Sequence, residues 1–136
     1  MKIKVDKGAV APSRAHETDA GLDLYSTSSG YIRAHSKRVF GTGVHVQIPH
    51  GCCGLLVSKS GLNVNKSITT TGLIDEGYTG EIMVSMYNHG DVEHRVEVGD
   101  KISQLVIIPC RYEEIDIVDE IEGGERDNAG FGSTGR

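Results

Sequence analysis

The sequence contains no tryptophan, and aromatic residues make up only 5% of it. It also lacks a long hydrophobic run. The longest unbroken aliphatic stretch covers residues 105–108, whereas a membrane-spanning helix needs about 20 apolar residues. Residues 1–6 show no apolar signal core. These absences exclude a membrane protein and lead us to expect a soluble, cytoplasmic one.

Cysteine and positive charge are both scarce. The three cysteines are an odd number, and their spacing matches neither CxxC nor a zinc-ligand pattern, so we expect buried, reduced thiols. The 14 Lys and Arg residues stand against 19 Asp and Glu, a net charge of −5 that argues against nucleic acid as a partner. A chain of 136 residues is bounded to one domain.

Alternating polarity is the dominant pattern in the chain. Residues 44–48 and 82–87 place every second side chain on one face, the period of half-buried strands, and shorter hints occur around residues 3–5, 96–98 and 115–117. Turn residues separate these runs, and glycine is abundant at 18 residues. Residues 60–66 could hold a single helical turn. The pattern predicts an all-β sandwich or barrel.

The end of the chain differs from the rest. Residues 111–127 hold eight acids against two arginines, which we interpret as a solvated edge strand and connector. Residues 123–136 then contain five glycines and one aromatic residue, too little to build a core. We therefore expect a β-barrel domain over residues 1–122 and a flexible, Gly-rich arm over residues 123–136.

Five short segments are unusually rich in Gly, Ser and Asp for barrel strands: residues 19–24, 58–62, 72–81, 99–105 and 126–135. In the last of them, small residues let backbone N–H groups approach an anion, and Arg126 and Ser133 add donors. A disordered Gly/Ser tail is the alternative interpretation. Phe131 favours binding, since an aromatic ring between glycines can stack on a base.

Lys59, Ser60 and Gly61 offer a charge, a hydroxyl and an open amide in succession, which suits di- or triphosphate oxygens, although Ser-Gly can be a simple turn. Asp23 could form an Asx turn or face a hydrated magnesium ion. Asp75 follows residues 73–74 at a predicted hairpin tip, where Tyr78 would begin the return strand. It is either a turn former or a carboxylate that orients or deprotonates a water.

In this order, the five segments resemble the five motifs of the homotrimeric dUTP pyrophosphatases (dUTPases), with a match from about Asp19 to Gly135. The resemblance implies a distorted jelly-roll β-barrel and a homotrimer whose active sites draw on all subunits. It implies an enzyme, a magnesium-dependent dUTP diphosphatase that converts dUTP and water into dUMP and pyrophosphate. Such an enzyme limits uracil incorporation into DNA and supplies dUMP for thymidylate synthesis, in the cytoplasm or, if virus- or phage-encoded, inside the host cell.

The resemblance also implies roles for individual residues. Asp75 would be the catalytic residue that activates the attacking water, and Asp23 would hold Mg²⁺ through its water shell. The hairpin from Thr69 to Met83 would read uracil largely through backbone groups, with Tyr78 excluding a ribose. The substrate-binding set as a whole would comprise Lys59, Ser60, Gly61, Thr69, Gly72, Leu73, Ile74, Asp75, Tyr78, Met83, Gln104, Arg126, Phe131, Gly132 and Ser133.

Several positions depart from the family pattern. Lys59 and Lys101 stand where arginine is frequent, which replaces a bidentate grip on phosphate by a point charge. Thr69 occupies a position where some members carry an asparagine for the uracil edge. Asp127 and Ala129 replace glycines of the arm, so its closing geometry would differ.

Two alternatives remain. A dCTP deaminase shares the trimeric barrel, but it carries a catalytic glutamate where this chain has Ser85 and tends to have phenylalanine where this chain has Tyr78. A nucleotide-switched binding module with a regulatory protein partner is the other. A pull-down with and without dUTP distinguishes the module from an enzyme alone.

Overall fold

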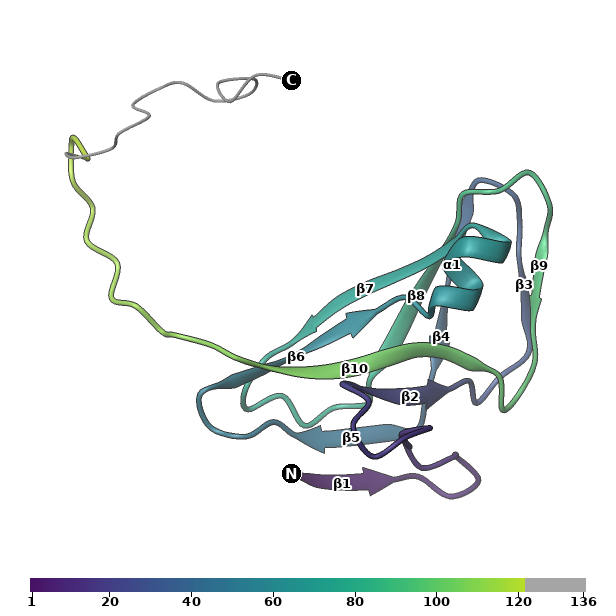
Figure 1. Cartoon of the computed structure of the whole chain (residues 1–136), viewed down its shortest axis with the longest axis horizontal. Coiled ribbons are helices and arrows are strands. Elements are labelled where there is room, and N and C mark those ends of the chain that lie inside the picture. The colour runs from purple at the N-terminus through teal and green to yellow at the C-terminus, as the bar shows by residue number, and fades with distance from the viewer. Residues whose placement is uncertain (122–136) are drawn as a thin grey trace.

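A computed structural model describes residues 1–121, which form ten strands and one short helix (Figure 1). The expected arm over residues 123–136 lies outside these residues. The strands are β1 (Lys2–Val5), β2 (Gly21–Tyr25), β3 (Gly30–Ile32), β4 (Ser36–Gly41), β5 (Val44–Gln47), β6 (Cys52–Val57), β7 (Ile68–Ile74), β8 (Met83–Asn88), β9 (His94–Val96) and β10 (Lys101–Pro109), and the helix is α1 (Ser60–Lys66).

Antiparallel pairing organises the strands into one large sheet and two ribbons. The six-stranded sheet has the order β2-β10-β6-β7-β8-β4, and the ribbons pair β1 with β5 and β3 with β9. Strand β10 comes late in the sequence and lies between β2 and β6 in this sheet. Segments from the two ends of the sequence therefore lie side by side. The all-β prediction is confirmed.

The core follows the alternation in the sequence. Val44 and Val46 of β5 are buried while Gln47 is exposed, and Val84 and Met86 of β8 are fully buried. Phe40 and Leu24 are among the largest side chains without solvent contact. The inner faces of the strands therefore meet in one hydrophobic core, as half-buried strands require.

Glycines with positive φ confirm two of the predicted turns. Gly51, after β5, has φ of 72°, and Gly99, before β10, has φ of 86°, a backbone region that other residues rarely adopt. The predicted helical turn is also present, and α1 extends over seven residues.

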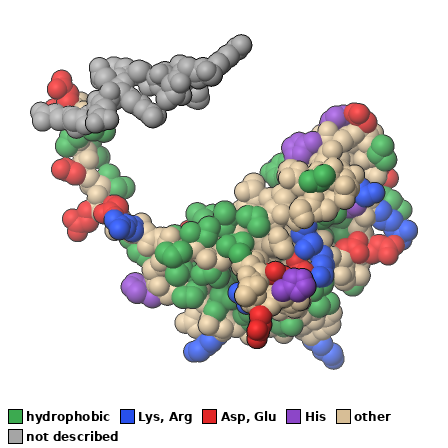
Figure 2. Space-filling view, in the orientation of Figure 1, with side chains coloured by type: hydrophobic (Ala, Val, Ile, Leu, Met, Phe, Trp, Pro, Cys, Tyr) green, Lys and Arg blue, Asp and Glu red, His purple; other side chains and the backbone are tan. Residues whose placement is uncertain are grey.

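The predicted edge strand near residues 115–117 is wrong. Residues 111–121 leave the body as an extended segment without a strand partner among residues 1–121 (Figure 1). Ile115 and Ile117 are 90% and 91% exposed, and Figure 2 shows hydrophobic side chains along this segment, away from the body. Alternating polarity alone cannot make a strand, because the backbone N–H and C=O groups also need a neighbouring strand to bond.

The three cysteines are free, as predicted, but they are partly exposed and not buried. Cys52 and Cys53 begin β6, and Cys110 directly follows the end of β10. Among the described residues, no helix is long and apolar enough to cross a membrane.

Candidate active site

A buried carboxylate anchors the first group of predicted site residues. Asp23, in the middle of β2, is only 3% exposed. Lys59 Nζ lies 2.5 Å from its Oδ1 and Lys101 Nζ lies 2.7 Å from its Oδ2, while Gln104 Nε2 donates to Oδ1 at 3.3 Å. The strand order β2-β10-β6 brings these residues together, because Lys101 and Gln104 lie on β10 and Lys59 follows β6.

The two lysines keep Asp23 ionised. Burial by itself raises the pKa of the Asp23 carboxyl, but hydrogen bonds from Lys101 and Lys59 outweigh it, and the pKa is lowered. The same contact raises the pKa of Lys101. One carboxylate thus faces two ammonium groups, which leaves an excess of positive charge suited to an anion.

Ser60 and Gly61 lie beside this charged group, at the start of α1 directly after Lys59. Ser60 is exposed, and the space around the Gly61 Cα is open, with nothing within 4 Å of where a Cβ would stand. A ligand can therefore approach the Gly61 backbone closely. The structure brings together five predicted site residues here: Asp23, Lys59, Ser60, Gly61 and Gln104.

The second group lies on the segment from β7 to β8. The ladder between these strands covers only residues 68–70 and 86–88. Beyond Thr70, β7 continues alongside β6 as far as Ile74, and β8 continues alongside β4 from Met86 to Met83. The two strands therefore diverge, and the sides of Gly72 and Leu73 that would face β8 are open to a ligand's polar groups.

The side chains around this divergence are partly apolar and exposed. Leu73 is 61% exposed and Met83 47%, whereas Ile74 points into the core. Tyr78 is wrongly predicted as the start of a strand: it lies in the loop before β8, and its Oη donates to the carbonyl of Glu81 at 3.0 Å. The chain turns at Gly77, whose φ is 89°, so the return strand begins later than the sequence pattern indicated.

The neighbour of Asp75 carries a network that sequence reasoning missed. Glu76 accepts hydrogen bonds from Tyr112 Oη at 2.7 Å, from His50 Nδ1 at 2.9 Å and from the Gly51 amide at 3.0 Å. The hydrogen bond from Tyr112, followed by those from His50 and Gly51, lowers the pKa of Glu76 to about 2. The sequence offered no signal for it, since Glu76 looks like an ordinary turn residue.

This network fixes the loop that carries Asp75. It connects the loop to the turn after β5 and to the segment that follows β10, and its carboxylate raises the pKa of Tyr112 to about 12. Asp75 itself remains exposed, in a cavity of about 570 Å³ that it shares with Leu73 and Tyr112. A carboxylate held on a braced loop and open to solvent can reach a water and a substrate.

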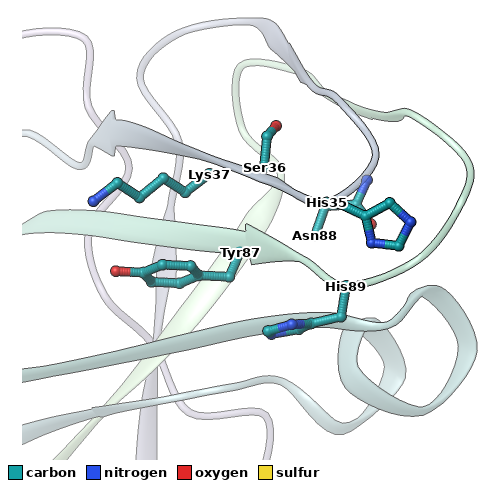
Figure 3. Close-up of a pocket in the computed structure, with 6 residues that line it drawn as sticks. All are labelled: His35, Ser36, Lys37, Tyr87, Asn88 and His89. Carbon is teal, nitrogen blue, oxygen red and sulfur yellow. The ribbon is translucent and has the colours of Figure 1, made fainter.

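Thr69 has a partner that was not predicted. Its Oγ1 lies 2.7 Å from His89 Nε2, and the His89 ring stacks on Tyr87 at 6.4 Å between centroids. Figure 3 shows Tyr87 and Lys37 extending in the same direction from β8 and β4, with His89 beside them in a surface pocket. The hydroxyl expected at the uracil edge is thus held by His89 in this structure.

The two groups lie far apart within one chain. The β6–β7 register ends at the pair of Gly54 and Ile74, and one further residue along it places Asp75 level with Cys53. Lys59 lies six residues from Cys53 along the direction of β6. At about 3.3 Å per residue this is a separation of about 20 Å. A nucleoside triphosphate would have to span that gap to place its α-phosphorus beside Asp75 and its other phosphates on Lys59 of the same chain.

The remaining predicted residues lie outside the described part of the chain: Arg126, Phe131, Gly132 and Ser133. Within residues 1–121, no three His, Cys, Asp or Glu side chains come together as metal ligands.

The chain matches the family model of the dUTPases over residues 7–135. It is 40% identical to the deoxyuridine 5'-triphosphate nucleotidohydrolase of Clostridium acetobutylicum, a match that covers 99% of this chain and 96% of the relative. It is 41% identical to the enzyme of the same name from Clostridium kluyveri, over 97% and 94% of the two chains.

Solved dUTPase structures show the same fold. A variant of the dUTPase of Staphylococcus bacteriophage 80alpha, with dUpNHpp, superposes with a TM-score of 0.91 at 33% identity, covering 99% of this chain and 98% of that one. A variant from phage phi11 of S. aureus, described with a structural Mg(II) ion, gives 0.80 at 30% identity over 90% and 98% of the chains. The jelly-roll prediction is confirmed by these neighbours.

Proposed function

Because the chain belongs to the dUTPase family and hydrolyses dUTP to dUMP and pyrophosphate, we propose how its residues divide that reaction. The match to the family model over residues 7–135 is the observation that carries the activity. Removal of dUTP limits uracil incorporation into DNA, and the dUMP formed supplies thymidylate synthesis.

Asp75 acts on the nucleophile. Its carboxylate accepts a proton from, or orients, the water that attacks the α-phosphorus, and the bond to the bridging oxygen of pyrophosphate breaks. The Glu76 network supports this role by holding the neighbouring residue at three points. Positioning matters more than covalent chemistry in a reaction of this type.

The charged group around Asp23 receives the phosphates. Lys59, Ser60, Gly61 and Gln104 contact phosphate oxygens, and the positive excess of two lysines over one carboxylate supports the assignment. From the C-terminal arm, Arg126, Gly132 and Ser133 add contacts to the terminal phosphates.

Uracil binds where β7 and β8 diverge. Backbone groups of Gly72, Leu73 and Ile74 pair with its donor and acceptor edge, and cytosine is rejected because its inverted edge leaves buried groups unpaired. Tyr78 excludes a ribose 2′-hydroxyl, Met83 packs against the nucleotide, and Phe131 stacks on the base. Thr69 contributes through a hydroxyl that His89 positions.

Magnesium fits the Asp23 group by its chemistry. Mg²⁺ keeps several waters and binds through one or two carboxylates together with substrate phosphates, and Asp23 is one ionised carboxylate beside the proposed phosphate site. Lys59 and Lys101 contact both of its oxygens in this structure. With an ion held through Asp23, the two lysines would be available to the phosphates. When bound, the ion neutralises phosphate charge through its water shell.

A homotrimer with shared sites completes the arrangement. The separation of about 20 Å between Asp75 and Lys59 supports it, since a second subunit can bring the two groups together. The extended segment supports it as well, because Ile115, Ile117 and Ile121 are exposed and need a surface to cover them. The enzyme acts where its charged substrate is held, in the cytoplasm or in the interior of a host cell.

The test is turnover of dUTP, dCTP, dTTP and UTP with Mg²⁺, measured as pyrophosphate release. We expect selective hydrolysis of dUTP and no deamination of dCTP, since Ser85 cannot replace a catalytic glutamate. Comparable turnover of UTP or dTTP would contradict the assignment of the base and sugar contacts.

A further inference from the structure

Cys53 on β6 and Cys110, just after the end of β10, lie near each other at one end of the sheet. In the β6–β10 register Cys53 is opposite Ile108, and Cys110 is two residues beyond Ile108, on the same side of the sheet. The Cys110 amide donates to the carbonyl of Gly51 at 2.8 Å, which holds it alongside β6. Both thiols are free and partly exposed.

The two cysteine side chains are diagonal neighbours on one face of the sheet. Interaction with the Cys110 thiol, together with burial, raises the pKa of Cys53. Cys52 differs from them. It lies on the opposite side of β6 and packs against the hydrophobic core, which makes it a matched internal control.

The pair lies in the cavity of Asp75. That cavity, of about 570 Å³, is lined by Cys53, Leu73, Asp75, Cys110 and Tyr112 among others. A change at the thiols is therefore a change in the wall around the proposed catalytic carboxylate. The sequence spacing gave no sign of it, because the two cysteines are 57 positions apart in the chain.

A cross-link between them requires a small shift of the chain. Diagonal neighbours on antiparallel strands have Cα atoms about 7–8 Å apart, while a disulfide spans about 4.4–6.8 Å. Cys110 has room for this shift, since β10 ends at Pro109. Tyr112, two residues later, would move with it and loosen its hydrogen bond of 2.7 Å to Glu76.

We propose that Cys53 and Cys110 form a dithiol site that a small-molecule disulfide converts reversibly into an intrachain disulfide, with a loss of dUTP hydrolysis. One protein thiolate attacks the small disulfide RS–SR, whose S–S bond breaks and releases RS⁻, which takes up a proton. The second protein thiol, on losing its proton, attacks the mixed disulfide and releases a second RSH. The protein loses two electrons and two protons, and RS–SR is reduced to two thiols.

A disulfide of this kind would resemble the transient, redox-sensing disulfides of reducing compartments. The effect on turnover rests on the proposed role of Asp75, whereas the cross-link itself does not. A displacement of about 1 Å near reacting groups can cost up to about a hundredfold in rate, so we expect a loss of about tenfold.

The experiment uses the full chain and oxidised glutathione as the probe. Peptide mapping under non-reducing conditions should find a Cys53–Cys110 link, with a mass lower by about 2 Da, and dUTP turnover should fall about tenfold and recover with dithiothreitol. Cys52→Ser should behave like the unmodified sequence. Cys53→Ser and Cys110→Ser, each checked for folding by circular dichroism, should keep turnover and resist its loss.

Three outcomes would overturn the proposal. They are a Cys52–Cys53 link in place of the predicted one, glutathione adducts without a cross-link, and a Cys53–Cys110 link that leaves turnover unchanged. Failure of the proposed function is a separate result: the reduced protein would then not hydrolyse dUTP at all, while the cross-link would still be visible by mass.

Discussion

At the scale of single residues, two carboxylates have opposite surroundings. Asp23 is buried and paired with two lysines, whereas Asp75 is exposed on a loop that its neighbour Glu76 braces. The first environment holds a permanent charge, and the second leaves a carboxylate open to accept a proton. The division of labour proposed for the reaction follows from this difference.

Asp75→Asn should lower kcat for dUTP by about 10²–10⁴, with little change in KM, because the amide keeps the shape of the carboxylate but cannot accept the proton. Steady-state pyrophosphate release measures both constants. Asp91→Asn is the matched control, since Asp91 is 93% exposed and bonds His35 away from the loop. A near-normal kcat in Asp75→Asn would remove this residue from the catalytic role.

Asp23→Asn should raise the Mg²⁺ concentration needed for half-maximal activity, because it removes the ionised carboxylate that faces the hydrated ion. EDTA should lower the activity of the unmodified chain, and added Mg²⁺ should restore it. The measurement is a magnesium titration of dUTP turnover for both proteins. Identical titration curves would contradict a role for Asp23 toward the ion.

Glu76 should make stability depend on acid pH. Its pKa is lowered from 4.5 to about 2 in the folded chain, so its contribution is fully present above about pH 4.5 and is lost as the pH falls toward 2. Thermal midpoints measured across this range should fall less in Glu76→Gln than in the unmodified chain. Glu113→Gln serves as control, since Glu113 is exposed in a long contact with Arg111. Equal slopes of the thermal midpoint against pH for all three proteins would show that protonation of Glu76 is not coupled to unfolding.

At the scale of elements, the close packing of strand β6 against its neighbours requires a glycine at position 54. A Cβ on Gly54 would stand 2.8 Å from Leu105 Cδ1 and 3.2 Å from Ile74 Cβ, on both neighbouring strands β10 and β7. Leu105 is fully buried and cannot swing away. The close packing of these three strands holds the two halves of the site at their fixed separation.

Gly54→Ala should therefore destabilise the fold by about 1–3 kcal/mol, the usual cost of overpacking. Gly61→Ala is the contrasting substitution, because nothing lies within 4 Å of its Cβ position and alanine favours a helix. Chemical denaturation of the two variants measures the difference. A Gly54→Ala variant as stable as Gly61→Ala would show that the neighbouring strands adjust to the added methyl group.

At the scale of the whole molecule, the separated groups lead to a test of shared sites. Asp75→Asn and Lys59→Met proteins should each be nearly inactive, because one lacks the base and the other a phosphate contact. After subunit exchange in an equal mixture, about one site in four should combine an intact Asp75 and an intact Lys59 from different chains. Turnover should then rise to about a quarter of that of the unmodified protein.

Exchange must be verified for this result to decide the question, for instance with differently tagged chains. Verified exchange without recovered activity would show that each site is built within one chain. A monomeric mass in solution would rule out the trimer directly.

The sequence by itself determined the all-β class, strands such as β5 and β8, several turns and the site motifs, since these depend on neighbouring residues and their period. It could not determine which side chains meet across the sheet. Lys59 reaches Asp23 over 36 residues and Gln104 reaches it over 81. The Glu76 network, the divergence of β7 from β8 and the placement of Cys110 diagonally across from Cys53 have the same origin. Strand register decides all of them, and register is set by packing of the whole core, which no local pattern encodes.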